Sequence, residues 1–265
     1  MITPNRNEYD YIISLGGNCN VSEQLKHRGL RKCSFPLDST LMKDSKPVKW
    51  LPFGILNRFS DFALQENMEK FEAPANEYGI FKQRLEDLVS GYRFIHQFTC
   101  PPEDKEGFTK ERRVIERRIK RFYDLVSKSK NVLFVLGTNF EYEDSLAKDI
   151  YNALAEAFPM VDVELICMQF AEGERNIRNL MENKIHIAKF GRRVDIVYDN
   201  QLTSVEWRWM DGVRIKGYPT VEELRKKNFW VKMRYKLWMK LGRSLERDCA
   251  GCCNMRFRDW TNGNS

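Results

Sequence analysis

The sequence predicts an α/β fold, in which a mixed, largely parallel sheet is flanked by helices. Three apolar runs, at 10–15, 131–137 and 161–168, have the length and the β-branched character of buried strands. A helical pattern at 143–158 separates the last two runs. Strands joined through a helix of ten or more residues form right-handed crossovers and lie parallel. Alternating strands and helices of this kind are typical of an α/β protein.

The other predicted elements follow from the same periodicities. Apolar residues at helical spacing indicate helices at 20–28, 46–62 and 109–128, the last with a strongly basic outer face. Residues with alternating or β-branched character indicate strands at 92–98, 195–198 and 205–210. Proline, glycine and asparagine indicate loops at 30–42 and 66–79.

The composition indicates a folded protein of the cytoplasm. Of the 265 residues, 42% are hydrophobic, which is enough to bury a large core. No stretch approaches the ~20 apolar residues of a membrane span, and residues 1–7 lack the apolar segment of a secretory signal. Seven cysteines, an odd number at irregular spacing, favour reduced thiols over a disulfide framework. We expect one α/β domain over residues 1–220.

Residues 221–265 form a second predicted unit, a basic aromatic helix with a cysteine-containing tail. Apolar side chains fall near one helical face at Trp230, Met233, Leu237 and Leu241. Lysine and arginine occupy the other faces between 229 and 243, which predicts a C-terminal basic amphipathic helix. Such a helix can lie peripherally on an anionic membrane surface, here the inner face of the membrane, or pack on the domain through the same apolar stripe.

The sequence contains no motif for nucleic acid, metal or cofactor binding. The net charge of +7 is modest and local, so we expect no specific nucleic acid partner. A phosphate at the turn of Gly16 and Gly17 is an alternative, but the glycine spacing of nucleotide-binding loops is missing. Half a zinc site is present at Cys249, Cys252 and Cys253, without a second pair of ligands nearby. We therefore expect no metal and no cofactor.

Cys19 is the strongest candidate for a reactive group. It follows the first predicted strand, past the turn of Gly16 and Gly17, and lies at the first turn of the helix at 20–28. Asn20 and Glu23, three residues apart, predict a capping box at the start of this helix. The unpaired N–H groups and the dipole of a helix N-terminus favour a thiolate. The alternative is a buried cysteine that only fills space.

Three segments of the chain resemble an uncharacterised bacterial family of papain-like cysteine peptidases. They are 13–19 (Ile-Ser-Leu-Gly-Gly-Asn-Cys), 30–31 (Leu-Arg) and 34–38 (Ser-Phe-Pro-Leu-Asp). The family pattern has Ser-Leu-Gly, a cysteine shortly after, Leu-Arg, and a Ser-aromatic-Pro-Phe-Asp-Trp block, in which this chain has Leu37 for the Phe and Ser39 for the Trp. The likeness covers about residues 9–170 and implies a papain-like or related fold.

The resemblance implies a nucleophile at Cys19 and a general base at His96. An imidazole that takes the thiol proton makes the sulfur a strong nucleophile toward an acyl carbon. The family often has an Asp directly after the histidine, where this chain has Gln97. Asp38 and Asn139 are therefore the candidates for the residue that orients the imidazole. The alternative for His96 is a core histidine between two phenylalanines.

The predicted function is that of a cysteine hydrolase or acyltransferase that works through a thioester at Cys19 on an acyl or peptide-like substrate. Backbone N–H groups around Gly17 and Asn18 are the expected donors to the oxyanion. The alternative is a non-catalytic or sugar-handling protein of bacterial surface-polysaccharide biosynthesis, associated with the membrane surface, that uses the same cleft only to bind.

Overall fold

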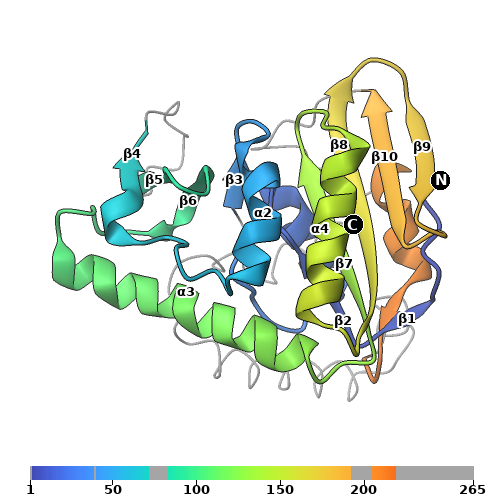
Figure 1. Ribbon diagram of the computed structural model, residues 1–265, viewed down its shortest axis with the longest axis horizontal. Helices are drawn as coiled ribbons and strands as arrows, with labels where there is room; N and C mark the ends of the chain where they lie inside the picture. The colour runs from blue at the N-terminus through green and yellow to red at the C-terminus, as the bar shows by residue number, and fades with distance from the viewer. Residues whose placement is uncertain (1, 39, 72–82, 192–204, 219–265) are drawn as a thin grey trace, which may run out of the picture.

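A computed structural model of the chain describes residues 2–38, 40–71, 83–191 and 205–218 (Figure 1). The predicted strand at 195–198, the domain boundary at 220, the helix at 229–243 and the C-terminal cysteines lie outside these residues. Within the described part of the chain, no helix is both long and apolar enough to cross a membrane.

The main sheet confirms the predicted α/β fold. Its strand order is β2-β7-β8-β10-β9. The parallel strands are β2 (Tyr11–Ser14), β7 (Asn131–Thr138), β8 (Asp162–Glu172) and β10 (Ile185–Gly191). At one edge, β9 (Asn176–Leu180) pairs antiparallel with β10. The three predicted apolar strands are thus neighbours at the centre of one sheet.

Helices cover both faces of this sheet, which therefore lies in the middle of three layers (Figure 1). On one face pack α2 (Lys46–Leu56), α3 (Lys105–Val126) and α4 (Asp144–Ala157). On the other pack α1 (Cys19–His27) and the 3₁₀ helix η2 (Val205–Gly212). Successive residues of β7 are buried on alternate faces, which explains its uninterrupted apolar sequence.

A second, antiparallel sheet has the order β3-β6-β5-β4. Its strands are β3 (Thr40–Met42), β6 (Tyr92–Phe98), β5 (Gln83–Asp87) and β4 (Met68–Lys70), and a short 3₁₀ helix, η1 (Gln65–Asn67), precedes β4. Two bonds join this sheet to the end of β2: Met42 N–H donates to the Gly17 carbonyl (3.2 Å), and the Tyr92 hydroxyl donates to the Leu15 carbonyl (3.2 Å). The second sheet therefore lies beside the turn that leads to Cys19.

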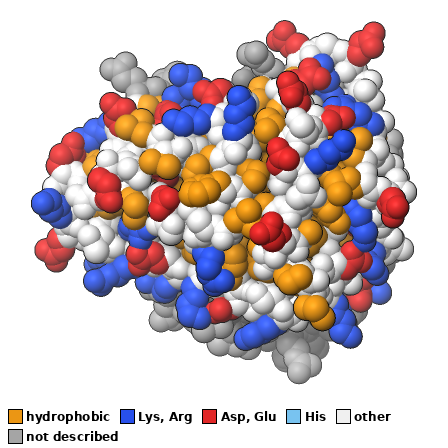
Figure 2. Space-filling model, in the orientation of Figure 1, with side chains coloured by type: hydrophobic (Ala, Val, Ile, Leu, Met, Phe, Trp, Pro, Cys, Tyr) orange, Lys and Arg blue, Asp and Glu red, His pale blue; other side chains and the backbone are white. Residues whose placement is uncertain are grey.

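Aromatic packing holds the second sheet to the rest of the molecule. Trp50 of α2 contacts Phe62 and Tyr92 with ring centroids 5.7 and 6.1 Å apart. Hydrophobic side chains also reach the surface where α2 lies (Figure 2), and Phe53 and Leu56 of this helix are exposed. A third pair of strands, β1 (Glu8–Tyr9) and β11 (Arg214–Ile215), is parallel.

Three local predictions need correction. The predicted loop at 30–42 is confirmed over residues 30–38 but ends in the strand β3, and the described part of the predicted loop at 66–79 contains the strand β4. The predicted strand at 205–210 is the 3₁₀ helix η2, because Trp207, Trp209 and Met210 are all buried against the same core, which alternation cannot achieve. The strand β10 was not predicted.

Candidate active site

The turn between β2 and α1 places Cys19 as the first residue of the helix. Gly16 and Gly17 both have positive φ, +80° and +87°. An added Cβ would lie 2.4 Å from Thr40 Oγ1 at Gly16 and 2.3 Å from the Gly137 carbonyl oxygen at Gly17. Glycine is therefore required at both positions by conformation and by contact. The contacts hold the N-terminus of α1 between β7 and β3.

The helix cap differs from the one predicted. The N-cap is Asn18, whose Oδ1 accepts from the Asn20 N–H (2.9 Å), so the helix begins one residue earlier than expected. Glu23 does not form a capping box but lies 3.5 Å from Lys26 Nζ. Asn18 is buried, and its Nδ2 donates to Asn139 Oδ1 (2.9 Å). Because β2 and β7 are parallel neighbours, the residues that follow them meet at one edge of the sheet.

The surroundings of Cys19 favour the neutral thiol. Burial, with a smaller contribution from the Glu23 carboxylate, raises the pKa of the Cys19 thiol to about 12, although the N–H groups of Cys19 and Asn20 act to lower it. The predicted influence of the helix N-terminus is present, but desolvation outweighs it. The expectation of a resting thiolate was therefore wrong, although Cys19 keeps some contact with solvent.

Asp38 closes a tight, buried turn. Its Oδ2 accepts from the Phe35 N–H (3.1 Å) and from Arg31 Nη1 (3.3 Å). Burial raises the pKa of the Asp38 carboxyl, and the nearby Arg31 and Arg118 guanidinium groups partly offset this. Within the described residues, no donor contacts the buried Oδ1. The Leu-Arg and Ser-Phe-Pro-Leu-Asp segments of the resemblance are thus joined by one ion pair.

His96 lies on β6 where that strand bulges. Phe94 pairs with Leu85 and Phe98 with Gln83, so four steps along β6 oppose two steps along β5. His96 keeps contact with solvent, whereas Phe94 and Phe98 are fully buried. An ordinary core histidine does not fit this position.

Gln97 links the bulge to Asp38, a role that sequence reasoning missed. Its Oε1 accepts from the His96 N–H (3.3 Å), and its Nε2 donates to the Asp38 carbonyl (2.9 Å). The structure thus places His96 beside the Asp38 turn, and Asn139 beside Asn18. The pairing of Cys19 with His96, and the choice of Asp38 or Asn139 as its third member, stay predictions.

The other two histidines contact polar side chains away from His96. His186 is buried, with Nε2 2.8 Å from Glu164 Oε1 and Nδ1 2.9 Å from Asn179 Oδ1. His27 ends α1, 3.8 Å from Glu23 Oε2, and burial lowers its pKa. Glu164, a carboxylate among the apolar residues 163–168 of β8, was the available signal for the first of these clusters.

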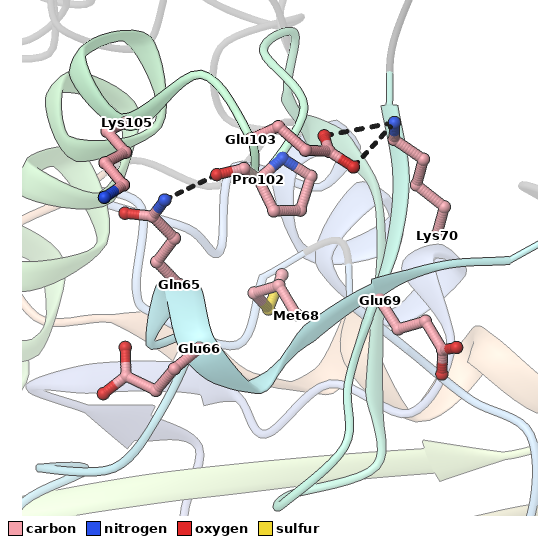
Figure 3. Close-up of a pocket in the computed structure, with 8 residues that line it drawn as sticks. All are labelled: Gln65, Glu66, Met68, Glu69, Lys70, Pro102, Glu103 and Lys105. Atoms are coloured by element: carbon pink, nitrogen blue, oxygen red, sulfur yellow. Dashed lines mark hydrogen bonds and ion pairs between the residues drawn. The ribbon is translucent and has the colours of Figure 1, made fainter.

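A surface hollow of about 740 Å³ lies elsewhere, beside η1 and β4 (Figure 3). It is lined by Gln65, Glu66, Met68, Glu69, Lys70, Pro102, Glu103 and Lys105. An ion pair of 3.2 Å joins Lys70 to Glu103 across it. The hollow shares no residue with the Cys19 site. Among the described residues, no cluster of His, Cys, Asp and Glu could hold a metal ion.

Comparison with known proteins gives one match. A family model described as "Putative papain-like cysteine peptidase (DUF1796)" matches residues 10–173. This range includes Cys19, Asp38, His96 and Asn139 and confirms the resemblance stated from the motifs. No curated protein matches the chain. No solved structure matches it either.

Proposed function

Because the chain belongs to the "Putative papain-like cysteine peptidase" family, we propose that it is a cysteine hydrolase or acyltransferase with Cys19 as its nucleophile and His96 as its general base. The substrate would be an acyl or peptide-like compound, joined to Cys19 as a thioester during the reaction.

The observation that supports this proposal best is the position of Cys19. It begins α1, directly after a glycine turn, at the carboxyl edge of the parallel sheet. Ligands of open α/β sheets bind at this edge. Backbone N–H groups at the start of a helix are donors that an oxyanion formed at Cys19 could use. Asn139, from the end of β7, borders the same place.

The neutral thiol determines how the reaction would begin. Since the pKa of Cys19 is raised to about 12, hardly any thiolate exists at neutral pH. His96 Nε2 or Nδ1 would take the thiol proton while the sulfur attacks the acyl carbon, forming a C–S bond and an oxyanion. Collapse of this intermediate expels the leaving group, which receives the proton from His96. Water or another acceptor, losing a proton to His96, then attacks the thioester, and the C–S bond breaks as the acyl product leaves and His96 returns the proton to the Cys19 sulfur.

Asp38 would contribute through the position of its turn. Gln97 bonds to the Asp38 carbonyl and to the His96 N–H, so the turn supports the strand that holds the general base. The buried Arg31–Asp38 ion pair in turn fixes the shape of the turn.

The test is acylation by an activated ester. The protein is treated with p-nitrophenyl acetate, and the acetylated residue is identified by peptide mass mapping. We expect a thioester at Cys19, absent in Cys19→Ala and kept in Cys100→Ser, which removes another partly exposed thiol. His96→Ala should slow acylation by about 10²–10⁴-fold. His27→Ala, at the other end of α1, should leave it unchanged.

Two results would contradict the proposal. One is acetylation of Cys19 no faster than that of Cys100. The other is an equal rate in His96→Ala and the unaltered protein. Binding of a sugar ligand near Cys19 without any covalent adduct would instead favour the alternative of a non-catalytic, sugar-handling protein.

A further inference from the structure

Three amide groups form a chain of hydrogen bonds at the edge of the sheet: the backbone N–H of Asn20 and the side chains of Asn18 and Asn139. Donor and acceptor chemistry determines how the two side-chain amides are oriented. The backbone N–H of Asn20 can only donate, so the atom of Asn18 that it meets must be the oxygen. The other end of the Asn18 amide is then NH₂, which can only donate to Asn139. Asn139 must therefore present its oxygen to Asn18.

The Nδ2 group of Asn139 is consequently left to face other partners. Within the described part of the chain, no acceptor contacts it. Asn139 is partly exposed, and the amide that holds it belongs to the residue directly before Cys19. The Thr138 hydroxyl donates to the Phe140 carbonyl (2.7 Å) and braces the backbone on both sides of Asn139. A side-chain N–H donor is thus held next to Asn18, the residue that precedes Cys19.

The same orientation favours a donor role for Asn139 over the role of the residue that orients the imidazole. An asparagine in that role accepts a hydrogen bond from the histidine ring N–H through its side-chain oxygen. In this protein that oxygen already accepts from Asn18 at 2.9 Å, which leaves one lone pair for a histidine ring, whereas both N–H bonds of its nitrogen stay available. Its nitrogen, in contrast, suits an acceptor that carries negative charge.

We infer that Asn139 is a catalytic residue that donates a hydrogen bond from Nδ2 to the oxyanion formed when Cys19 attacks an acyl group. The inference rests on the proposed function and adds a side-chain donor to the backbone N–H groups around Gly17 and Asn18. The chain of bonds from Asn20 through Asn18 fixes the donor before the substrate arrives. Donors that need no reorganisation are the effective ones in oxyanion stabilisation.

Two reactions of the same sulfur test this role. Acylation by p-nitrophenyl acetate passes through an oxyanion, whereas alkylation by iodoacetamide is a direct displacement at carbon and forms none. The ratio of the two rate constants at Cys19 therefore reports on oxyanion stabilisation and removes changes in thiol ionisation. Asn139→Asp keeps an acceptor for Asn18 but lacks the donor, and Asn139→Ala removes the whole amide.

In both variants we expect the ratio to fall by about 10²–10³-fold, the usual effect of losing one oxyanion donor. The matched control is Asn131→Ala at the opposite end of β7, where an asparagine Oδ1 accepts from the Asp10 N–H (2.9 Å). This control should leave the ratio unchanged. Thermal unfolding shows whether each variant is folded, and Asn139→Asp preserves the bond to Asn18 if Asn139→Ala does not fold.

The outcomes separate the inference from the proposed function. Acylation of the unaltered protein at Cys19, together with an unchanged ratio in the Asn139 variants, overturns the role of Asn139 alone. An equal fall of acylation and alkylation also overturns it, because that pattern indicates a residue acting on the thiol or on His96. Failure of the unaltered protein to be acylated overturns both.

Discussion

The backbone of Gly17 lies in the left-handed region, and its Cα approaches the carbonyl oxygen of Gly137. A Cβ there would be 2.3 Å from that oxygen, a distance that real Cβ atoms essentially never show. The residue must therefore be glycine for two separate reasons. Because this contact holds the start of α1 against the end of β7, it also sets the position of Asn18 relative to Asn139.

We expect Gly17→Ala to reduce both the stability of the protein and the acylation of Cys19. The left-handed conformation costs a residue with a Cβ about 1–2 kcal/mol, and the clash with Gly137 adds to this cost. Gly217→Ala is the matched control, since Gly217 has a similar φ of +75° and an added Cβ there would meet none of the described residues. Thermal unfolding and ester acylation measure the two effects. Equal losses in both variants would show that the contact with β7 is unimportant.

One side-chain amide, that of Gln97, bonds to the backbone at the bulge of β6. Gln97 lies between two backbones, accepting from the His96 N–H and donating to the Asp38 carbonyl. The side chain thereby bridges β6 and the Asp38 turn. This bridge lies next to the pairing of β3 with β6, which begins with Thr40 opposite Phe94. The contact between β6 and the Asp38 turn therefore helps to position His96.

Gln97→Glu should slow acylation of Cys19 by about tenfold or more, because the new carboxylate cannot donate to the Asp38 carbonyl and the strand shifts. Gln65→Glu removes a bond of the same kind, from Nε2 to the Pro102 carbonyl (2.5 Å), at the separate surface hollow. Both variants should lose a similar stability, about 1 kcal/mol, in urea unfolding. Only Gln97→Glu should change the rate of acylation. A normal rate in that variant would exclude Gln97 from positioning His96.

The elements that sequence patterns predicted are those whose burial is regular. The strand β7 is buried on both faces and α4 on one, so a continuous run and a helical stripe were sufficient. The short strands β3 and β4 have three residues each, too few for a period to appear. In η2, tryptophans at positions 207 and 209 have the alternating spacing that is typical of a strand, but both are buried in a 3₁₀ helix.

Some parts of the candidate site could likewise be predicted from local sequence patterns, and others could not. The strand, glycine turn and helix around Cys19 are local in sequence, and they were enough to single out Cys19 as the candidate nucleophile. The bonds that build the rest join residues far apart, with 121 positions between Asn18 and Asn139 and 59 between Asp38 and Gln97. No local pattern records such a contact. The balance between helix N-terminus and desolvation at Cys19 likewise depends on the folded surroundings.

At the scale of the whole molecule, a buried carboxylate joins the N-terminal segment to the main sheet. Glu164 of β8 accepts from the Tyr9 hydroxyl (2.6 Å) and the Asn5 N–H (2.8 Å), and it lies 2.8 Å from His186 Nε2. Burial raises the pKa of Tyr9, so its hydroxyl remains a donor. With a second acceptor, Asn179 Oδ1, at its Nδ1, the His186 ring has an acceptor at each nitrogen. One residue therefore connects β1, β8 and β10.

Glu164→Ala should destabilise the fold by about 3–5 kcal/mol, because it leaves several buried donors without their acceptor. Glu8→Ala is the matched control in the same N-terminal segment, where the carboxylate forms a surface ion pair with Arg214 (3.0 Å) that is worth about 0–1 kcal/mol. Urea unfolding measures both losses. Glu164 lies toward the amino end of β8, whereas Cys19 lies beyond the carboxyl end of β2, so the folded Glu164→Ala protein should still be acylated at the normal rate. A small loss of stability, equal to that of Glu8→Ala, would mean that the N-terminal segment is held by other contacts.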